Sequence, residues 1–87
     1  MNVIYKYPLS LPQVNALELP ESFFVALVAI QEGQIRIWIE HDPEAEKIPY
    51  QFIIYGTGHP IPEHMTHVGS VISGPYVWHV YYQEVGT

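Results

Sequence analysis

Hydrophobic and polar residues alternate along much of this chain, with the period of two that is typical of β-strands. The clearest case is residues 34–41, where an isoleucine at every second position alternates with Arg36, Trp38 and Glu40. Successive strand side chains point to opposite faces, so the isoleucines are expected to enter a core. The other face, with Arg36, Trp38 and Glu40, is left for solvent, a ligand or a partner.

The most hydrophobic run of the chain, residues 23–31, directly precedes this strand. It is apolar on both faces, which predicts a central strand covered by core on one side and by a subunit interface on the other. Glu32-Gly33 between the two runs predicts a tight hairpin turn. Ser73-Gly74-Pro75 predicts a second hairpin, which leads into residues 76–84.

Short alternating segments of this kind recur along the whole chain, and helical periodicity is nearly absent. Pro8 is expected to end the first of them. The predicted strands span residues 3–7, 15–19, 23–31, 34–41, 50–55, 66–72 and 76–84. The pattern predicts one all-β domain over residues 1–87, a small antiparallel β-sandwich or barrel of six to seven short strands.

The composition adds an expectation about partners. Hydrophobic residues make up 48% of the 87 residues and charged residues only 14%, where about a quarter is usual. Large exposed apolar patches are rare on stable monomers, so a homo-oligomer is expected. The formal charge of −6 disfavours DNA or RNA as a partner. No stretch is long and apolar enough to predict a membrane span or a secretion signal.

The stretch with the most distinctive chemistry is Tyr55-Gly56-Thr57-Gly58-His59-Pro60-Ile61-Pro62. Glycines make its backbone permissive, and the two prolines then make it rigid. Such a turn can aim several backbone N–H groups at one phosphate or carboxylate, with Thr57 and His59 as further donors. The alternative is a bulged strand end that the prolines hold in place.

An anionic ligand at this turn would need more than backbone donors. The chain has three lysines and arginines in all, and Arg36 beside Trp38 is the best placed by sequence. We therefore expect Arg36, Trp38 and Tyr55 to join the glycine-rich turn in a ligand site, with an aromatic ring stacked on a base. Copies of the chain in an oligomer could each bring a cation to a shared pocket.

Four residues with metal-binding side chains follow closely: His59, Glu63, His64 and His67. Imidazoles and a carboxylate can bind zinc, but the spacing matches no known helical two-histidine motif, and exposed loop histidines are the commoner outcome. No nucleophile, orienting partner or oxyanion site accompanies them. We expect no catalytic residue, no metal and no cofactor, and keep a metal-dependent hydrolase as the third reading.

A stripe of acidic residues lies between two of the predicted strands. It comprises Glu40, Asp42, Glu44 and Glu46. A solvated charged loop is the default interpretation, and a docking surface for a basic partner protein is the alternative.

The sequence resembles a family of small phage- and prophage-encoded proteins of unknown function that carry an IYGTGHPI signature. The resemblance rests on residues 4–8, 35–38, 54–61 and 77–80. It implies a small accessory phage gene product acting in the host cytoplasm, and transfers no catalytic residue.

Such phage proteins commonly antagonise host defence. The resemblance therefore implies, by analogy, a non-enzymatic oligomeric sponge for a small nucleotide-type immune signal. A direct inhibitor of a host defence complex, acting through the acidic and aromatic surface, is the alternative.

Overall fold

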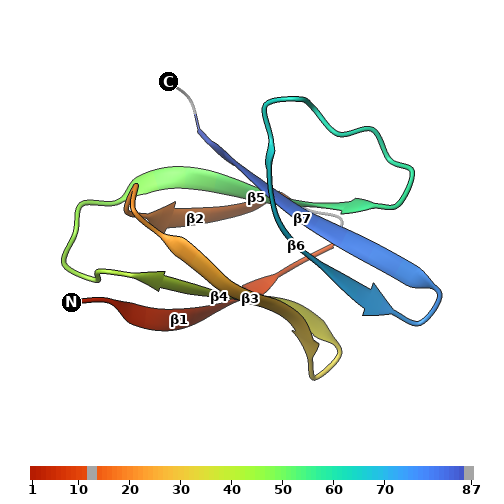
Figure 1. The fold of residues 1–87 in the computed structure, drawn as a ribbon, viewed down its shortest axis with the longest axis horizontal. Coiled ribbons are helices and arrows are strands. Elements are labelled where there is room, and N and C mark those ends of the chain that lie inside the picture. Colours follow the sequence, from red (N-terminus) through yellow and green to blue (C-terminus); the bar gives the residue numbers. More distant parts are fainter. Residues whose placement is uncertain (12–13, 86–87) are drawn as a thin grey trace.

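The computed structural model describes residues 1–11 and 14–85 and contains seven antiparallel strands in two sheets (Figure 1). Sheet A has the order β1-β4-β3, and sheet B has the order β2-β5-β7-β6. The strands are β1 (Val3–Leu9), β2 (Asn15–Leu19), β3 (Phe24–Gln31), β4 (Gln34–His41), β5 (Ile48–Gly56), β6 (Thr66–Ser73) and β7 (Tyr76–Glu84). The all-β prediction is confirmed, and the two separate sheets make the fold a sandwich. Within the described residues, no helix is long and apolar enough to cross a membrane.

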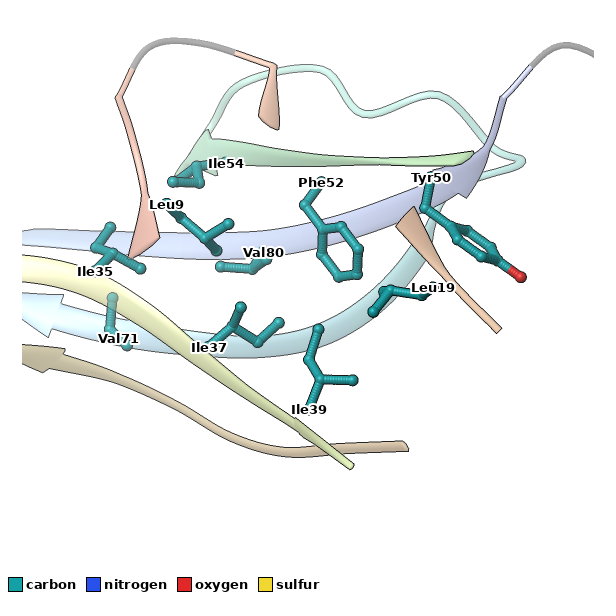
Figure 2. Packing of buried hydrophobic residues seen from close by; sticks show 10 residues of the cluster. All are labelled: Leu9, Leu19, Ile35, Ile37, Ile39, Tyr50, Phe52, Ile54, Val71 and Val80. Atoms are coloured by element: carbon teal, nitrogen blue, oxygen red, sulfur yellow. The ribbon is translucent and has the colours of Figure 1, made fainter. Parts of the chain in front are cut away.

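The core lies between the two sheets, and Figure 2 shows its ten buried hydrophobic side chains. The isoleucine face of β4 enters it as predicted, and Ile37 and Ile39 are fully buried. Phe52 of β5 and Val80 of β7 meet them from sheet B and are also fully buried. Since each strand alternates, burying one face of every strand leaves two outer faces of very different composition.

Two predictions about strand ends and strand order are wrong. The first strand does not end at Pro8, because β1 continues to Leu9, which is buried in the core. A proline is tolerated there because β1 is an edge strand, where the missing N–H can face solvent. The apolar run of residues 23–31 is not a central strand either. It forms β3 at the edge of sheet A, and β4 takes the centre.

The two predicted hairpin turns are confirmed. Glu32 and Gly33 both have positive φ, 54° and 74°, as a two-residue type I′ turn requires. Gly74 has a φ of 57° between the paired residues Ser73 and Tyr76, as in a type II′ turn.

One edge of each sheet meets the other at a close contact between β3 and β6. A Cβ atom added to Gly69 in β6 would lie only 2.7 Å from Cγ2 of Val28 in β3. β6 carries a register shift between His67 and Gly69, which increases the local twist at this point. A glycine is therefore required where the two sheets approach most closely.

This contact predicts a compensating pair of substitutions. Gly69→Ala should lower the free energy of unfolding by about 1–3 kcal/mol, because the added methyl group overpacks against Val28. Val28→Ala in the same chain should recover part of that loss, so the double variant is less destabilised than the sum of the singles. Urea unfolding midpoints of the four proteins measure the coupling, and strictly additive losses would contradict the contact.

The buried aromatic end of the core predicts a pH dependence. Burial raises the pKa of the Tyr50 phenol, and the carboxylates of Glu84 and Glu21 add to the effect. A raised pKa in the folded state means that the unfolded chain loses this proton first. The stability contribution of neutral Tyr50 is therefore complete below about pH 10 and is lost as the pH rises through the folded pKa.

Tyr50→Phe should make the free energy of unfolding fall less steeply above pH 10 and change it little at pH 7. Figure 2 shows the Tyr50 hydroxyl turned away from the other nine core side chains, so its removal leaves the packing in place. Chemical unfolding at a series of pH values tests this. Identical alkaline slopes for the two proteins would refute it.

Candidate functional site

The glycine-rich stretch and the acidic stripe lie at opposite ends of the sandwich. β4 runs from the Glu32-Gly33 turn to His41, the acidic loop follows, and β5 runs back to Gly56. In Figure 1 the loop between β4 and β5 lies at the left, with the N-terminus, and the loop after β5 lies at the right. We call the right-hand turn, Gly56 to His59, the glycine corner.

The glycine corner is a closed β-turn. The His59 amide donates to the Gly56 carbonyl over 3.1 Å, and Gly58 has a φ of 91°, as the third residue of a type II turn requires. The Gly56 amide donates to Nδ1 of the His59 ring over 3.1 Å. These bonds use two of the four amides that the sequence suggested for an anion. The amides of Thr57 and Gly58 are not used by them.

The same bond fixes the chemistry of the His59 ring. Since Nδ1 accepts from Gly56, a neutral ring carries its proton on Nε2. His59 therefore offers one N–H donor at the exposed side of the corner. The donor requires no positive charge on the ring.

A cavity of about 460 Å³ opens beside the glycine corner, within the size range of small-molecule sites. Its lining joins the corner to the start of β7. The lining residues are Gly56, Thr57, His59, Pro75, Tyr76, Val77 and Trp78. The rings of Tyr76 and Trp78 stack with centroids 5.7 Å apart and 23° between their planes. The cavity thus combines polar donors with two flat aromatic surfaces.

A second cavity of about 320 Å³ is also lined by Trp78, together with Gly33 and Ser73 from the two hairpins. Trp78 is its only aromatic lining residue. The cavity at the glycine corner is the better candidate site, because it brings the two rings and the donors together.

Gly56 is held between two rings of the site. A Cβ atom at this position would lie 3.0 Å from Cε1 of His59 and 3.2 Å from Cζ3 of Trp78. The absence of a side chain is what lets both rings approach the end of β5. Gly58 differs, since open space surrounds its Cα and only its positive φ favours glycine.

A chain of hydrogen bonds ties the corner to the outer face of sheet B. Thr57 Oγ1 donates to the Val77 carbonyl over 3.5 Å, so it accepts from Nε2 of His79 over 2.9 Å. Nδ1 of a neutral His79 must then accept, and Ser70 Oγ donates to it over 2.7 Å. Ser70 in turn accepts from Nε2 of His67 over 3.0 Å. These directions hold when the Thr57 hydroxyl donates to the Val77 carbonyl; when it donates to Nε2 of His79 instead, the bonds through His79 and Ser70 reverse together.

This arrangement has a structural role. A serine that donates to a histidine resembles a nucleophile and its base, but the third member here is Thr57. A neutral hydroxyl cannot stabilise an imidazolium as a carboxylate does. The chain of bonds instead fixes Thr57 at the rim of the cavity.

The structure brings together only part of the predicted ligand site. Gly56, Thr57 and His59 line the cavity, and Gly58 completes their turn. Tyr55 faces outward from sheet B, where its ring packs edge-on against Tyr81.

Arg36 and Trp38 lie on the outer face of sheet A, because their strand buries its isoleucines. Within one chain they contribute nothing to the lining of this cavity.

The weak metal candidates have separate partners. His59 accepts from Gly56, His64 donates to Gln83, and His67 is hydrogen-bonded to Ser70. In the described part of the chain, no group of three or more histidine, aspartate or glutamate residues could hold a metal ion.

The acidic stripe is partly occupied by local contacts. Asp42 accepts from the Glu44 amide over 2.9 Å and lies 3.8 Å from the N-terminal amine. Glu40 accepts from Asn2 over 3.1 Å. Glu44 and Glu46 are exposed. The loop is a structured turn with two carboxylates directed to solvent.

Sequence reasoning did not assign six residues to the site: Pro75, Tyr76, Val77 and Trp78 of the cavity lining, and Ser70 and His79 behind Thr57. Alternation along residues 76–84 does place Tyr76 and Trp78 on one face, so the aromatic pair was visible as a pattern. The alternation of hydrophobic and polar residues does not predict that Gly56 pairs with Trp78, and this pairing brings β7 to the glycine corner.

The fold and the cavity place this chain among small antiparallel β-sandwich proteins, with an aromatic cavity at one end of the sandwich. The model of one protein family, described as "Domain of unknown function (DUF7352)", matches residues 1–87, and the chain belongs to that family. That description assigns no catalytic activity. No curated protein and no solved structure matches the chain.

The two corner glycines make a matched pair of tests. Gly56→Ala should displace the His59 and Trp78 rings and lower the free energy of unfolding by about 1–3 kcal/mol, as overpacking does. Gly58→Ala should cost about 1–2 kcal/mol through its positive φ alone and leave the rings in place. Tryptophan fluorescence of the folded variants separates the two cases. A spectral shift in Gly58→Ala and none in Gly56→Ala would contradict this account.

Proposed function

We propose that this protein is a non-enzymatic phage counter-defence protein that binds a small nucleotide-type immune signal in the cavity at the glycine corner. It would act as a homo-oligomeric sponge in the host cytoplasm. The observation that carries the proposal is the meeting of hydrogen-bond donors and a stacked aromatic pair around one cavity.

The aromatic wall supports a ligand with a planar ring. Tyr76 is 60% exposed beside the half-buried Trp78, so a ring face is open to a ligand. Stacking on such a ring contributes about 1–3 kcal/mol per base and tolerates different bases. The donors of the corner would meet the polar or phosphate groups of the same ligand.

The charge of the site restricts the ligand further. The cavity lining contains none of the three lysine and arginine residues of the chain, and the formal charge of the chain is −6. A polyphosphate would be repelled by this protein. Amide and imidazole N–H donors suit a ligand of low charge, such as a nucleotide with phosphodiester or monophosphate groups.

The phage context comes from the resemblance of residues 4–8, 35–38, 54–61 and 77–80 to the IYGTGHPI-bearing phage proteins. Sequestration needs affinity and no chemistry on the ligand, which fits a site with donors, rings and no carboxylate-supported histidine. The wider role is an analogy and rests on that resemblance.

Tyr76→Ala should weaken binding of a nucleotide ligand by about tenfold to a hundredfold, the loss expected when one stacking ring is removed. Titration calorimetry against a panel of cyclic and linear nucleotides provides the measurement. Tyr55→Ala is the matched control, because its ring lies on Tyr81 outside the cavity lining. Equal loss in both variants, or loss only in Tyr55→Ala, would move the site away from this cavity.

The same samples distinguish a sponge from an enzyme. Ligand released by heat denaturation should be chemically intact by mass spectrometry. Converted ligand would contradict the non-enzymatic proposal, and absence of binding to every nucleotide in the panel would contradict the ligand class.

A second candidate function is a direct protein inhibitor that uses the acidic stripe. The observation in its favour is that Glu44 and Glu46 are exposed at the end of the sandwich farthest from the glycine corner. An acidic surface of this kind attracts a basic partner, including one that normally holds nucleic acid. Among the described residues, the only charged contact within the stripe joins Asp42 to the N-terminal amine.

A further inference from the structure

The outer face of sheet A is a three-by-three grid of side chains that nothing in the described chain covers. Three apolar residues on it are strongly exposed: Ile4 by 53%, Phe24 by 65% and Leu27 by 51%. From the acidic-loop end to the hairpin end, the rows are Ile4, Glu40 and Phe24; Lys6, Trp38 and Leu27; and Pro8, Arg36 and Ala29. Contiguous apolar surface of this kind marks an interaction site.

Positive and negative side chains lie at opposite ends of this grid along the strand direction. Lys6 Nζ and Arg36 Nη1 both donate to Oε1 of Gln31 over 3.0 Å, which gathers two of the three cations of the chain near the hairpin end. Glu32 lies 3.3 Å from Arg36 and offsets one of these two charges. Glu40 occupies the other end of the same strand. One end of the face is therefore positive and the other negative.

We propose that a second copy of this chain docks on the outer face of sheet A, with a two-fold axis along the row of Lys6, Trp38 and Leu27. This axis runs across the strands, so the partner's rows are reversed. Glu40 then faces Arg36 of the partner subunit, twice by symmetry. The large Phe24 faces the small Ala29 of the partner subunit, and Trp38 meets its own copy at the centre.

The alternative axis is excluded by charge. A two-fold axis parallel to the strands would place Glu40 opposite Glu40 and Arg36 opposite Arg36, and like charges directly opposed are unfavourable. Both axes keep the strands of the two sheets aligned, as is usual for sandwiches, so the charges decide between them. Lys6 does not oppose its own copy head-on, because its amine is held at Gln31 toward the positive end.

The chemistry of the face also selects a copy of the same chain as partner. The protein carries −6, which repels copies at most orientations. On this face the cations Lys6 and Arg36 balance Glu40 and Glu32, so two copies can approach here without net repulsion. At ordinary strand spacings the face measures about 24 by 14 Å. Pairing two such faces buries on the order of 1,000 Å², near the lower limit for a specific interface.

This inference specifies the oligomer named in the proposed function and rests on that part of it alone. Its test uses the intact chain without ligand, so failure here leaves the cavity measurements standing. Sedimentation equilibrium over a range of concentrations should show a reversible dimer. Leu27→Glu should abolish the dimer. Ile72 is 76% exposed on the outer face of sheet B, so Ile72→Glu should leave the dimer intact. A monomer at every concentration, or a dimer lost only in Ile72→Glu, would overturn the proposal.

A charge exchange tests the orientation. Glu40→Arg and Arg36→Glu should each weaken dimerisation by at least about tenfold, because each opposes like charges at two symmetric contacts. The double variant restores both pairs and should return the dissociation constant to within about threefold of the original. Circular dichroism confirms that each variant is folded. A double variant that stays as weak as the singles would overturn the axis across the strands.

Discussion

The burial of the isoleucine face of β4 against sheet B is the contact on which the structure depends. Ile37 and Ile39 are fully buried, and they meet Phe52 and Val80 from the opposite sheet. A domain of 87 residues has material for one core of this size and no second one. Because successive side chains of a strand point to opposite faces, the burial of the isoleucines also determines which side chains of β4 lie on the outer face. Trp38 and Arg36 are on the surface because their neighbours are in the core.

The two outer faces that result have different chemistry. Sheet A presents large apolar groups with a few charges, and sheet B presents tyrosines and hydrogen-bonded histidines. His67, Ser70 and His79 satisfy one another and Thr57 on sheet B, so that face pairs its own polar groups. Sheet A leaves Phe24 and Leu27 without a covering layer. The two outer faces therefore differ in how far their own side chains cover them.

Local pattern was sufficient for the strands and the turns. The alternation of residues 34–41 and the Glu32-Gly33 turn predicted β4, its core face and its hairpin, because strand period and turn geometry are set by near neighbours. The pairing of strands that are distant in the sequence is not determined by near neighbours. The position of β3 at a sheet edge and the contact of Gly69 with Val28 depend on how the two sheets stack.

The residues of the candidate site also fall into two groups: those that local sequence predicts and those that strand pairing brings to the site. The glycine corner was visible from Gly56 to His59, since glycine, histidine and proline restrict the backbone locally. Tyr76 and Trp78 joined it only through the pairing of β5 with β7, and Ser70 with His79 through the pairing of β6 with β7. The residue types of Arg36 and Trp38 suit an anionic ligand with a planar ring, which is why the sequence predicts them at the same site. Their strand places them on the other sheet.

The separation of the sites has a consequence for an assembled protein. Seven residues line the cavity at the glycine corner, all of them from β5, β7 and the turns beside these strands in sheet B. A copy docked on the outer face of sheet A would cover none of these residues. Each chain of such a dimer would therefore keep its own cavity, and the dimer would hold two ligands independently. The sequence suggested Arg36 and Trp38 for a pocket shared between subunits; in the proposed dimer the same two residues would instead hold the copies together.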